Sequence, residues 1–261
     1  MKRIVLPCLS LLLTGSLFAQ QKEGKVTYER SVQMQITMAT RGGEPQTISQ
    51  TRTNKFELNF ANNQMSWKQL EDDIQADEAA QTGGMMIRNL GSGQDDITFC
   101  DFSQSKKVEQ RDFMDKRFLI SDSIQKGNWK LADETKTILN HLCRKATTQR
   151  IGKRMSMGMQ NGKMERTEVD DTTTTIAWFT TDIPVPAGPE VQGQLPGLIL
   201  ELEVNGGRTI YKALDIQAKP DMAAIKEPTK GKKVTRAEFT EETKKLIDQM
   251  QQNGGMRFRM N

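Results

Sequence analysis

The stretch that decides the fold spans residues 172–215 and reads TTTTIAWFTTDIPVPAGPEVQGQLPGLILELEVNGGRTIYKALD. It opens with β-branched and aromatic residues, which favour a β-strand. The prolines within 184–189 fix φ and remove backbone donors, so no central strand or helix passes through them. Apolar residues resume at Leu198 and then alternate with glutamates. Asn-Gly-Gly at 205–207 predicts a turn, and residues 209–214 return as a third strand.

Upstream, residues 24–38 show the clearest strand pattern of the chain. One parity is apolar, and it comprises Val26, Tyr28, Val32, Met34, Ile36 and Met38. Only Arg30 breaks this apolar row, and the other parity is polar, as in an antiparallel sheet with one dry face. Further strand candidates are residues 46–52, 55–60, 97–102, 118–121, 129–139 and 142–150. The sequence therefore predicts a mainly β fold, with an antiparallel, strongly curved sheet or half-barrel.

The last residues, 219–261, are expected to leave the sheet as a linker, an amphipathic helix and a tail. Lys230-Gly231-Lys232-Lys233 is interpreted as a basic linker. Thr235 and Glu238 have the spacing of a capping box at a helix start. An apolar stripe follows, formed by Phe239, Leu246, Ile247 and Met250. We expect this helix to pack back on the sheet; the alternatives are a partner contact or a membrane surface, and mixed charges on its polar face argue against an anionic membrane.

The first 19 residues have the pattern of a secretory signal peptide, with a basic start and an apolar run. Cleavage after Ala19 removes Lys2 and Arg3 and no acidic residue, which lowers the formal net charge from +4 to +2. The apolar run is shorter than the about 20 residues that span a bilayer, so no transmembrane segment is expected after cleavage. We expect a periplasmic or secreted protein with a β domain at 20–218. Near-neutral charge and export both argue against nucleic acid as a partner.

Several motifs of this chain resemble those of the GLPGLI family, exported Bacteroidetes proteins of unknown function. Gln194-Leu195-Pro196-Gly197-Leu198-Ile199 is similar to the hexapeptide that names the family, with Gln194 where Gly is usual. Other residues that carry the resemblance are Trp178, Pro184, Gly188, Pro189, Trp129 and Cys143. The resemblance is clearest over 129–218. It implies an envelope location and supplies no catalytic residues.

Two cysteines remain after signal cleavage, because Cys8 leaves with the signal peptide. Cysteines of exported chains commonly pair, so a disulfide between Cys100 and Cys143 is predicted. The alternative is two buried thiols on neighbouring strands. A redox site is disfavoured, since the chain has no Cys-x-x-Cys motif.

His141 is the chain's single histidine and limits the enzyme classes that the sequence can support. A serine or cysteine hydrolase needs a base, and His141 lies beside Asn140 at an expected surface turn between strands. One histidine and two distant cysteines make a poor zinc ligand set. A glycosidase pair of carboxylates stays open, with no pair singled out. No catalytic residues and no cofactor are therefore assigned.

Met155, Met157, Met159 and Met164 form the unusual cluster of the sequence. Thioethers suit Cu(I), and alternate positions of an extended hairpin share a face. The alternatives are a sticky contact surface or an ordinary hairpin tip at Asn161-Gly162, because methionine is frequent throughout this chain.

Together these features predict an exported, non-enzymatic envelope protein that acts as a periplasmic binding or accessory module. Its partner is expected to be an envelope protein or a lipid-like ligand. Copper handling through the methionine cluster is the alternative, and a hydrolase ranks last. An apolar cavity on the concave face would favour a carrier, convergent methionine sulfurs would favour copper, and a filled sheet would favour a scaffold.

Overall fold

The structure is a computed structural model that describes residues 21–38, 46–70, 95–160 and 163–252. Within 34–38, 46–48, 154–160, 163–168 and 250–252 it describes the backbone alone. The strands are β1 (Gly24–Met38), β2 (Gln46–Ala61), β3 (Gln64–Gln69), β4 (Ile97–Asp101), β5 (Lys106–Phe113), β6 (Lys116–Ser123), β7 (Lys130–Ile138), β8 (His141–Gln160), β9 (Lys163–Thr180), β10 (Leu198–Val204), β11 (Thr209–Gln217) and β12 (Lys232–Val234). One helix, α1 (Arg236–Gln252), follows them.

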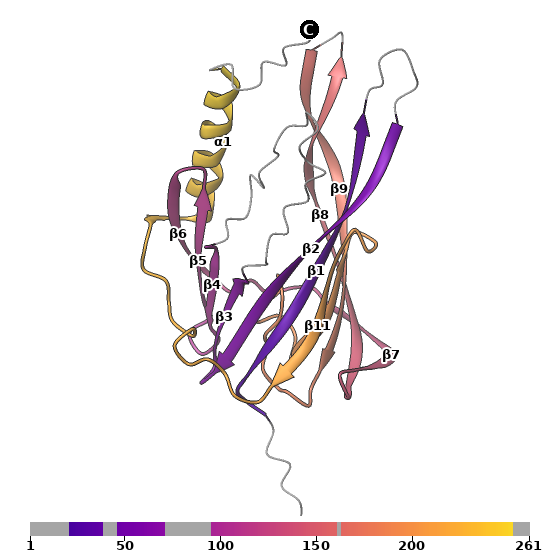
Figure 1. Cartoon of the computed structure of the whole chain (residues 1–261), viewed down its shortest axis with the longest axis vertical. Coiled ribbons are helices and arrows are strands. Elements are labelled where there is room, and N and C mark those ends of the chain that lie inside the picture. Colours follow the sequence, from indigo (N-terminus) through magenta and orange to yellow (C-terminus); the bar gives the residue numbers. More distant parts are fainter. Residues whose placement is uncertain (1–20, 39–45, 71–94, 161–162, 253–261) are drawn as a thin grey trace, which may run out of the picture.

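These strands form one sheet in the order β12-β6-β5-β4-β3-β2-β1-β11-β10-β9-β8-β7. Described neighbours pair antiparallel except β12, which pairs parallel with β6. The sheet is open in the described chain, because β12 and β7 end its order and do not pair with each other. Figure 1 shows the long β1–β2 and β8–β9 hairpins extending in the same direction. The predicted mainly β fold with a C-terminal helix is confirmed.

β1 begins and ends where the sequence pattern predicts. Val26 and Tyr28 of its apolar row are fully buried, while Arg30 in the same row is partly buried. β1 pairs along its whole length with β2, from Gly24 opposite Phe60 onward. The two strands predicted at 46–52 and 55–60 are thus one long strand, because pairing with β1 continues through the polar residues between them.

The main core lies on the inner face of the sheet and joins strands from both halves of the chain. Its fully buried large side chains are Tyr28, Phe60, Phe179, Leu58, Met65, Ile183, Leu198, Ile199, Leu200 and Leu202. Ile183 and Leu195 belong to the Pro- and Gly-rich segment 182–197, which therefore packs into the core. Its backbone is tied to β10, since Leu198 N donates to Ile183 O at 3.0 Å and Ile199 N to Ala187 O at 3.0 Å.

A smaller core lies under α1. Phe113, Phe118, Ile120 and Val234 are buried there, and Phe239, Leu246 and Ile247 of the helix pack against them. The helix starts with the predicted capping box, in which Glu238 N donates to Thr235 Oγ1 at 3.2 Å and Thr235 N to Glu238 Oε2 at 2.7 Å. α1 lies beside β5 and β6 in Figure 1. The expected packing of the helix on the sheet is observed.

The predicted basic linker differs from the structure. Lys232 and Lys233, expected in an irregular linker, form β12 with Val234 at the edge of the sheet. The segment before it is held by Lys106 Nζ, which contacts both carboxylate oxygens of Glu227 at 2.7 and 2.8 Å. A strand of this length is too short to show an apolar periodicity, so the sequence did not reveal β12.

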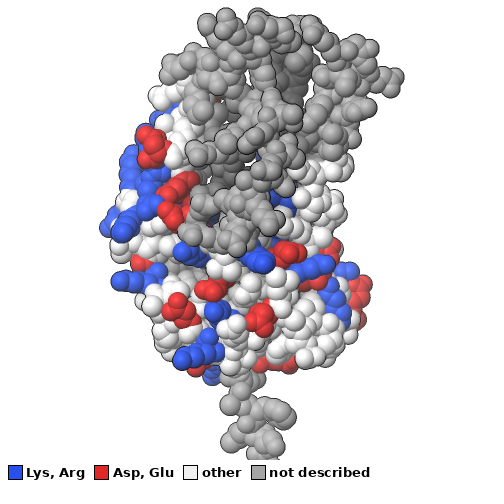
Figure 2. Space-filling model, viewed as in Figure 1, with Lys and Arg blue, Asp and Glu red and all other residues white. Residues whose placement is uncertain are grey.

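No helix in the described ranges combines the length and apolarity that crossing a bilayer requires. The expected signal peptide lies outside the described residues. Figure 2 shows basic and acidic side chains intermixed over the described part of one face.

Candidate functional site

A small pocket opens on the inner face of the sheet, and we call it the aromatic–ion pocket. Its lining combines aromatic rings with charged and amide groups, contributed by Arg30, Phe56, Trp67, Gln69, Asp96, Thr98, Lys107, Glu109, Arg111, Glu190, Gln192 and Tyr211. The cavity volume is about 60 Å³. That is space for a few water molecules. The pocket therefore suits a small group rather than an acyl chain.

The curvature of the sheet creates this pocket. Lys107 lies on β5 and Tyr211 on β11, and both line it. β4, β3, β2 and β1 separate these two strands in the sheet order. At about 4.8 Å per strand, a flat sheet would place β5 and β11 about 24 Å apart. Strong bending is therefore needed to bring both to one small cavity, as the sequence analysis expected for this fold.

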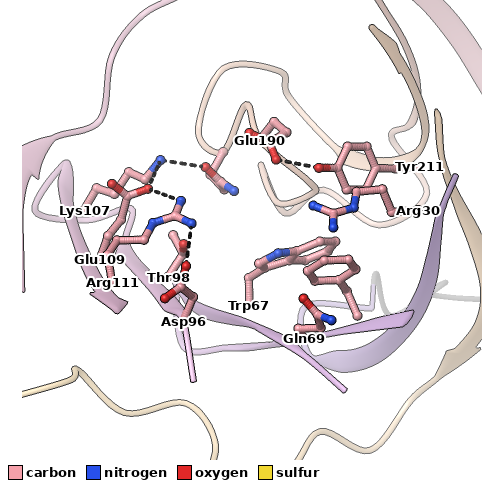
Figure 3. A pocket seen from close by; sticks show the side chains of 12 residues that line it. Arg30, Trp67, Gln69, Asp96, Thr98, Lys107, Glu109, Arg111, Glu190 and Tyr211 are labelled. Carbon is pink, nitrogen blue, oxygen red and sulfur yellow. Dashed lines mark hydrogen bonds and ion pairs between the residues drawn. The ribbon is translucent and has the colours of Figure 1, made fainter. Parts of the chain in front are cut away.

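Three aromatic rings form one wall of the pocket (Figure 3). Phe56 and Trp67 are stacked, with centroids 5.0 Å apart and planes 15° apart. Tyr211 meets both rings edge-on, at 6.2 Å from Phe56 and 6.1 Å from Trp67. Offset-stacked and edge-to-face pairs are favourable arrangements of aromatic quadrupoles. The wall is therefore a packed apolar surface beside the polar groups of the pocket.

An ion network forms the opposite wall, carried by alternate residues of β5. Glu109 is 3% exposed, and its Oε1 accepts contacts from Lys107 Nζ at 3.2 Å and Arg111 Nη2 at 3.3 Å. Arg236, the first residue of α1, forms an ion pair with the other oxygen of Glu109. Arg111 Nη1 also donates to Asp96 Oδ2 at 3.0 Å. One buried carboxylate is thus shared by three cations, and it connects the pocket to the start of the helix.

Lys107 is a cation of this network whose pKa is lowered. Burial lowers its pKa, because desolvation disfavours the ammonium form, while Glu190 acts in the opposite direction. Its Nζ also donates to Gln192 Oε1 at 3.3 Å. Lys107 is therefore a cation with little solvent to stabilise it.

The crossing segment 182–197 supplies the rim of the pocket. Glu190 adopts a positive φ of 58° after Pro189, and its Oε1 accepts a hydrogen bond from the Tyr211 hydroxyl at 2.6 Å. Burial and the neighbouring Glu190 carboxylate raise the pKa of Tyr211, so its hydroxyl stays a donor at neutral pH. The contact fixes the rim of the pocket to β11.

Arg30 reaches the pocket from β1 and stands apart from the ion network (Figure 3). Its guanidinium carbon lies 4.9 Å from the centroid of Phe56, and its Nη2 donates to Asn54 Oδ1 at 3.0 Å. Its Nε is buried and has no hydrogen-bond acceptor in the part of the chain that the structure describes. The one polar residue in the apolar row of β1 thus faces the site, and this break in pattern is the sequence feature that could have located it.

The residues of the hexapeptide motif have packing roles. Leu195, Leu198 and Ile199 are buried in the main core. The carbonyl of Ile199 accepts a hydrogen bond from the buried Tyr28 hydroxyl at 2.7 Å. A Cβ on Gly197 would lie 2.0 Å from the Thr180 carbonyl oxygen. The motif therefore joins β9 and β10 closely and lies apart from the lining of the pocket.

The other residues of the resemblance are also placed by packing. Gly188 and Pro189 are buried in the crossing segment, Pro184 is partly buried, and Pro196 is exposed. Trp178 lies under the ammonium of Lys136, whose Nζ is 4.3 Å from the ring centroid. Gln194, which replaces the usual Gly, accepts a hydrogen bond from Trp129 Nε1 at 3.0 Å. None of these residues lines the aromatic–ion pocket.

Both cysteines are buried free thiols in this structure, so the predicted disulfide between Cys100 and Cys143 is absent from it. They lie on β4 and β8, which are separated by six strands in the sheet order. Burial raises the pKa of each thiol to about 11. The alternative of two buried thiols describes them, but on distant rather than neighbouring strands.

His141 begins β8 directly after the Leu139-Asn140 turn, both residues of which have positive φ. Its Nδ1 lies 3.2 Å from Asp182 Oδ2, on a half-buried surface. The Cys143 thiol contacts the carbonyl oxygen of His141 at 3.6 Å. Burial raises the pKa of this thiol to about 11, and a thiol with such a pKa is a poor nucleophile at neutral pH.

The methionine cluster lies in the β8–β9 hairpin. The backbone register places Met159 opposite Met164, Met157 opposite Arg166 and Met155 opposite Glu168. The side chains of these methionines lie outside the described residues. Among the described residues, no group of three or more His, Cys, Asp or Glu side chains is arranged to hold a metal ion.

A second hollow lies beside the β10–β11 turn and has a volume of about 450 Å³. Its lining is mainly threonine and charged side chains with Ile176. This is a broad polar depression without an aromatic wall.

One family model matches part of the chain. Residues 129–201 match the family described as "Protein of unknown function (Porph_ging)". No curated protein sequence matches the chain.

Two solved structures of PNGF-II are similar in fold. The structure in space group C2 is similar to this chain with a TM-score of 0.50 and 14% sequence identity. The alignment covers 85% of this chain and 33% of the PNGF-II chain. The form in space group P21 has a TM-score of 0.49 and 15% identity, and covers 86% and 33%. The chain thus spans about a third of the length of PNGF-II, and at this identity the likeness concerns the fold alone.

Proposed function

We propose that this chain is an exported, non-enzymatic binding or accessory module of the cell envelope that holds its ligand at the aromatic–ion pocket. The observation that carries the proposal is the pocket itself. It combines an aromatic wall, a buried ion network and a buried donor on Arg30 without an acceptor among the described residues. Convergent polar groups in a preformed concave site are the usual features of a binding site.

The interior of the sheet favours recognition of a small group over storage of a lipid. Large side chains fill the inner face, and the pocket beside them has a volume of about 60 Å³. An envelope protein partner that inserts one side chain or terminus therefore suits this site better than a lipid-like ligand.

A binding role also suits the chemistry of the candidate catalytic groups. His141 is engaged with Asp182 at a turn, and burial raises the pKa of both thiols to about 11. The basic start and apolar run of the first 19 residues support export. Residues 194–199 lie inside the matched span 129–201, which supports the GLPGLI resemblance as part of the proposal.

The test is native mass spectrometry of the full protein purified from its own cell envelope without refolding. We expect a chain that starts at Gln20 and carries a co-purifying mass. Lys107→Met should lose that mass, because it removes a pocket cation at nearly constant volume. Lys106→Met is the matched control, since Lys106 is the neighbouring residue of β5 and binds Glu227 outside the pocket. A bare wild-type mass, or equal retention by Lys107→Met, would overturn the proposal.

Copper handling is the second candidate function, and the register of the β8–β9 hairpin favours it by placing Met159 opposite Met164. Cu(I) added to the purified protein should appear as a bound metal in the native mass spectrum. Replacing Met155, Met157 and Met159 with leucine should abolish this addition. Met222→Leu is the control, because Met222 is exposed at a distance in the sequence from the hairpin. Unchanged copper binding by the triple variant would exclude the cluster.

A further inference from the structure

The lining of the aromatic–ion pocket carries three cations and three carboxylates. Arg30, Lys107 and Arg111 line it, and Arg236 enters the same network through Glu109. The carboxylates are Asp96, Glu109 and Glu190. Lys107 and Arg111 both pair with Glu109, and Arg111 also pairs with Asp96. Buried cations are stabilised by such pairing, and Arg30 lacks it among the described residues.

Arg30 is the cation without a carboxylate in the described chain. Its contacts there include the Asn54 side-chain oxygen, the face of the Phe56 ring and the hydroxyl oxygen of Tyr211. A guanidinium carries several donors in a planar fork, and its Nε here has no acceptor among the described residues. Such a fork matches the two oxygens of a carboxylate or a phosphate. The position of Arg30 over Phe56 holds the fork in place before a ligand arrives.

The shape of the pocket restricts the rest of the ligand. A volume of about 60 Å³ accepts an anionic group and little more. The wall of Phe56, Trp67 and Tyr211 favours a flat or apolar body beside the charge. Lys107 also lines the pocket, and its ammonium, which pairs with Glu109 at 3.2 Å, is a second cation within reach of a bound anion.

We propose that the aromatic–ion pocket binds an anionic group of carboxylate or phosphate size, with Arg30 as its principal contact. This inference rests on the proposed binding function and names the chemical class of its ligand. The carboxylate and phosphate sources share the recognition chemistry, and they are separated by the test.

The test follows the indole N–H of Trp67 by NMR in the full protein at constant ionic strength. Three probes are titrated separately: sodium benzoate, inorganic phosphate and benzamide, the neutral counterpart of benzoate. We expect saturable shifts with benzoate or phosphate and none with benzamide. Saturation by benzoate alone identifies a carboxylate source, and saturation by phosphate alone identifies a phosphate source.

Arg30→Gln should lower the affinity for the anion at least roughly tenfold, because the substitution removes charge-assisted hydrogen bonds. Arg144→Gln is the control, since Arg144 is an exposed arginine of β8 outside the pocket. Circular dichroism confirms that each variant is folded. If Arg30→Gln proves unfolded, Arg30→Lys replaces it: Lys keeps the charge but loses the fork, and is expected to weaken binding by a smaller factor.

Two results would overturn the inference: no saturation by either anion, or equal anion affinity in wild type and the Arg30 variant. Failure here is distinguishable from failure of the proposed function. If a mass co-purifies with wild type and is lost in Lys107→Met, but neither anion binds, the proposed binding function holds and an anionic ligand is excluded. A bare wild-type mass would exclude the binding function directly.

Discussion

Replacing Gly197 with alanine tests whether the hexapeptide motif serves packing. A Cβ at this position would lie 2.0 Å from the carbonyl oxygen of Thr180 and 2.8 Å from its carbonyl carbon. Ordinary contact begins near 3.4 Å, so the end of β9 and the start of β10 would have to separate by more than 1 Å. These atoms are backbone and cannot rotate away. The strain would extend to Leu198 and Ile199, which are buried in the main core.

The expected cost follows from two opposing terms. Overpacking of a well-packed interior costs about 1–3 kcal/mol, and rigid backbone atoms place this site at the upper end. Alanine in place of glycine lowers the entropy of the unfolded chain, which returns about 0.4–1 kcal/mol. The net destabilisation is therefore about 2 kcal/mol. For a chain of this size that corresponds to a fall in melting temperature of about 4–8 °C.

The assay is thermal and urea unfolding of wild type and Gly197→Ala, followed by circular dichroism. Gly152→Ala is the matched control: this glycine lies in β8, and an added Cβ would meet no atom within 4 Å. We expect the control to match wild type or to be slightly more stable. If Gly197→Ala melted within about 2 °C of wild type, the close approach of β9 and β10 would not be required, and a packing role for the motif would be refuted.

Three further predictions concern the rest of the fold. Phe239→Ala should destabilise the protein by about 2 kcal/mol in urea titration, because it removes the ring packed edge-on against Phe118 at 5.2 Å; an unchanged midpoint would contradict docking of α1. Asp112→Asn should cost about 0.5–1 kcal/mol near neutral pH, because Arg117 binds the Asp112 carboxylate through two hydrogen bonds. That hydrogen bonding lowers the pKa of Asp112, so its stabilisation is present above the unfolded pKa of about 4 and is lost as pH falls through the folded pKa. The stabilities of the two proteins should therefore converge as pH falls through the folded pKa of Asp112, and a gap independent of pH would contradict the ion pair. Cys100 and Cys143 should react with a thiol reagent only after unfolding, because both are buried with a pKa of about 11; an oxidised mass with no reactive thiol in either state would show a disulfide instead.

Periodic patterns made the regular parts of the fold predictable. The alternation of β1 determined its ends and its buried face, and the capping box located the start of α1. β5 was missed, although it supplies Lys107, Glu109 and Arg111 to the pocket. Its inner face is charged because the residues pair with one another, so burial there leaves no apolar alternation. β3 is short, and its contribution to the site, Trp67, has no local pattern to distinguish it.

The candidate site was visible in the sequence only as the polar Arg30 in an otherwise apolar row. The sequence by itself determined the charge, the strand periodicity, the helix capping and the signal-like start, because each of these features depends on composition or on residues close in sequence. Contacts between Arg30, Trp67, Lys107, Glu190 and Tyr211 join five distant parts of the chain. Only the tertiary structure decided these contacts. The curvature of a large sheet and the path of segment 182–197 across it result from packing interactions over the whole chain, and these interactions produce no local sequence pattern.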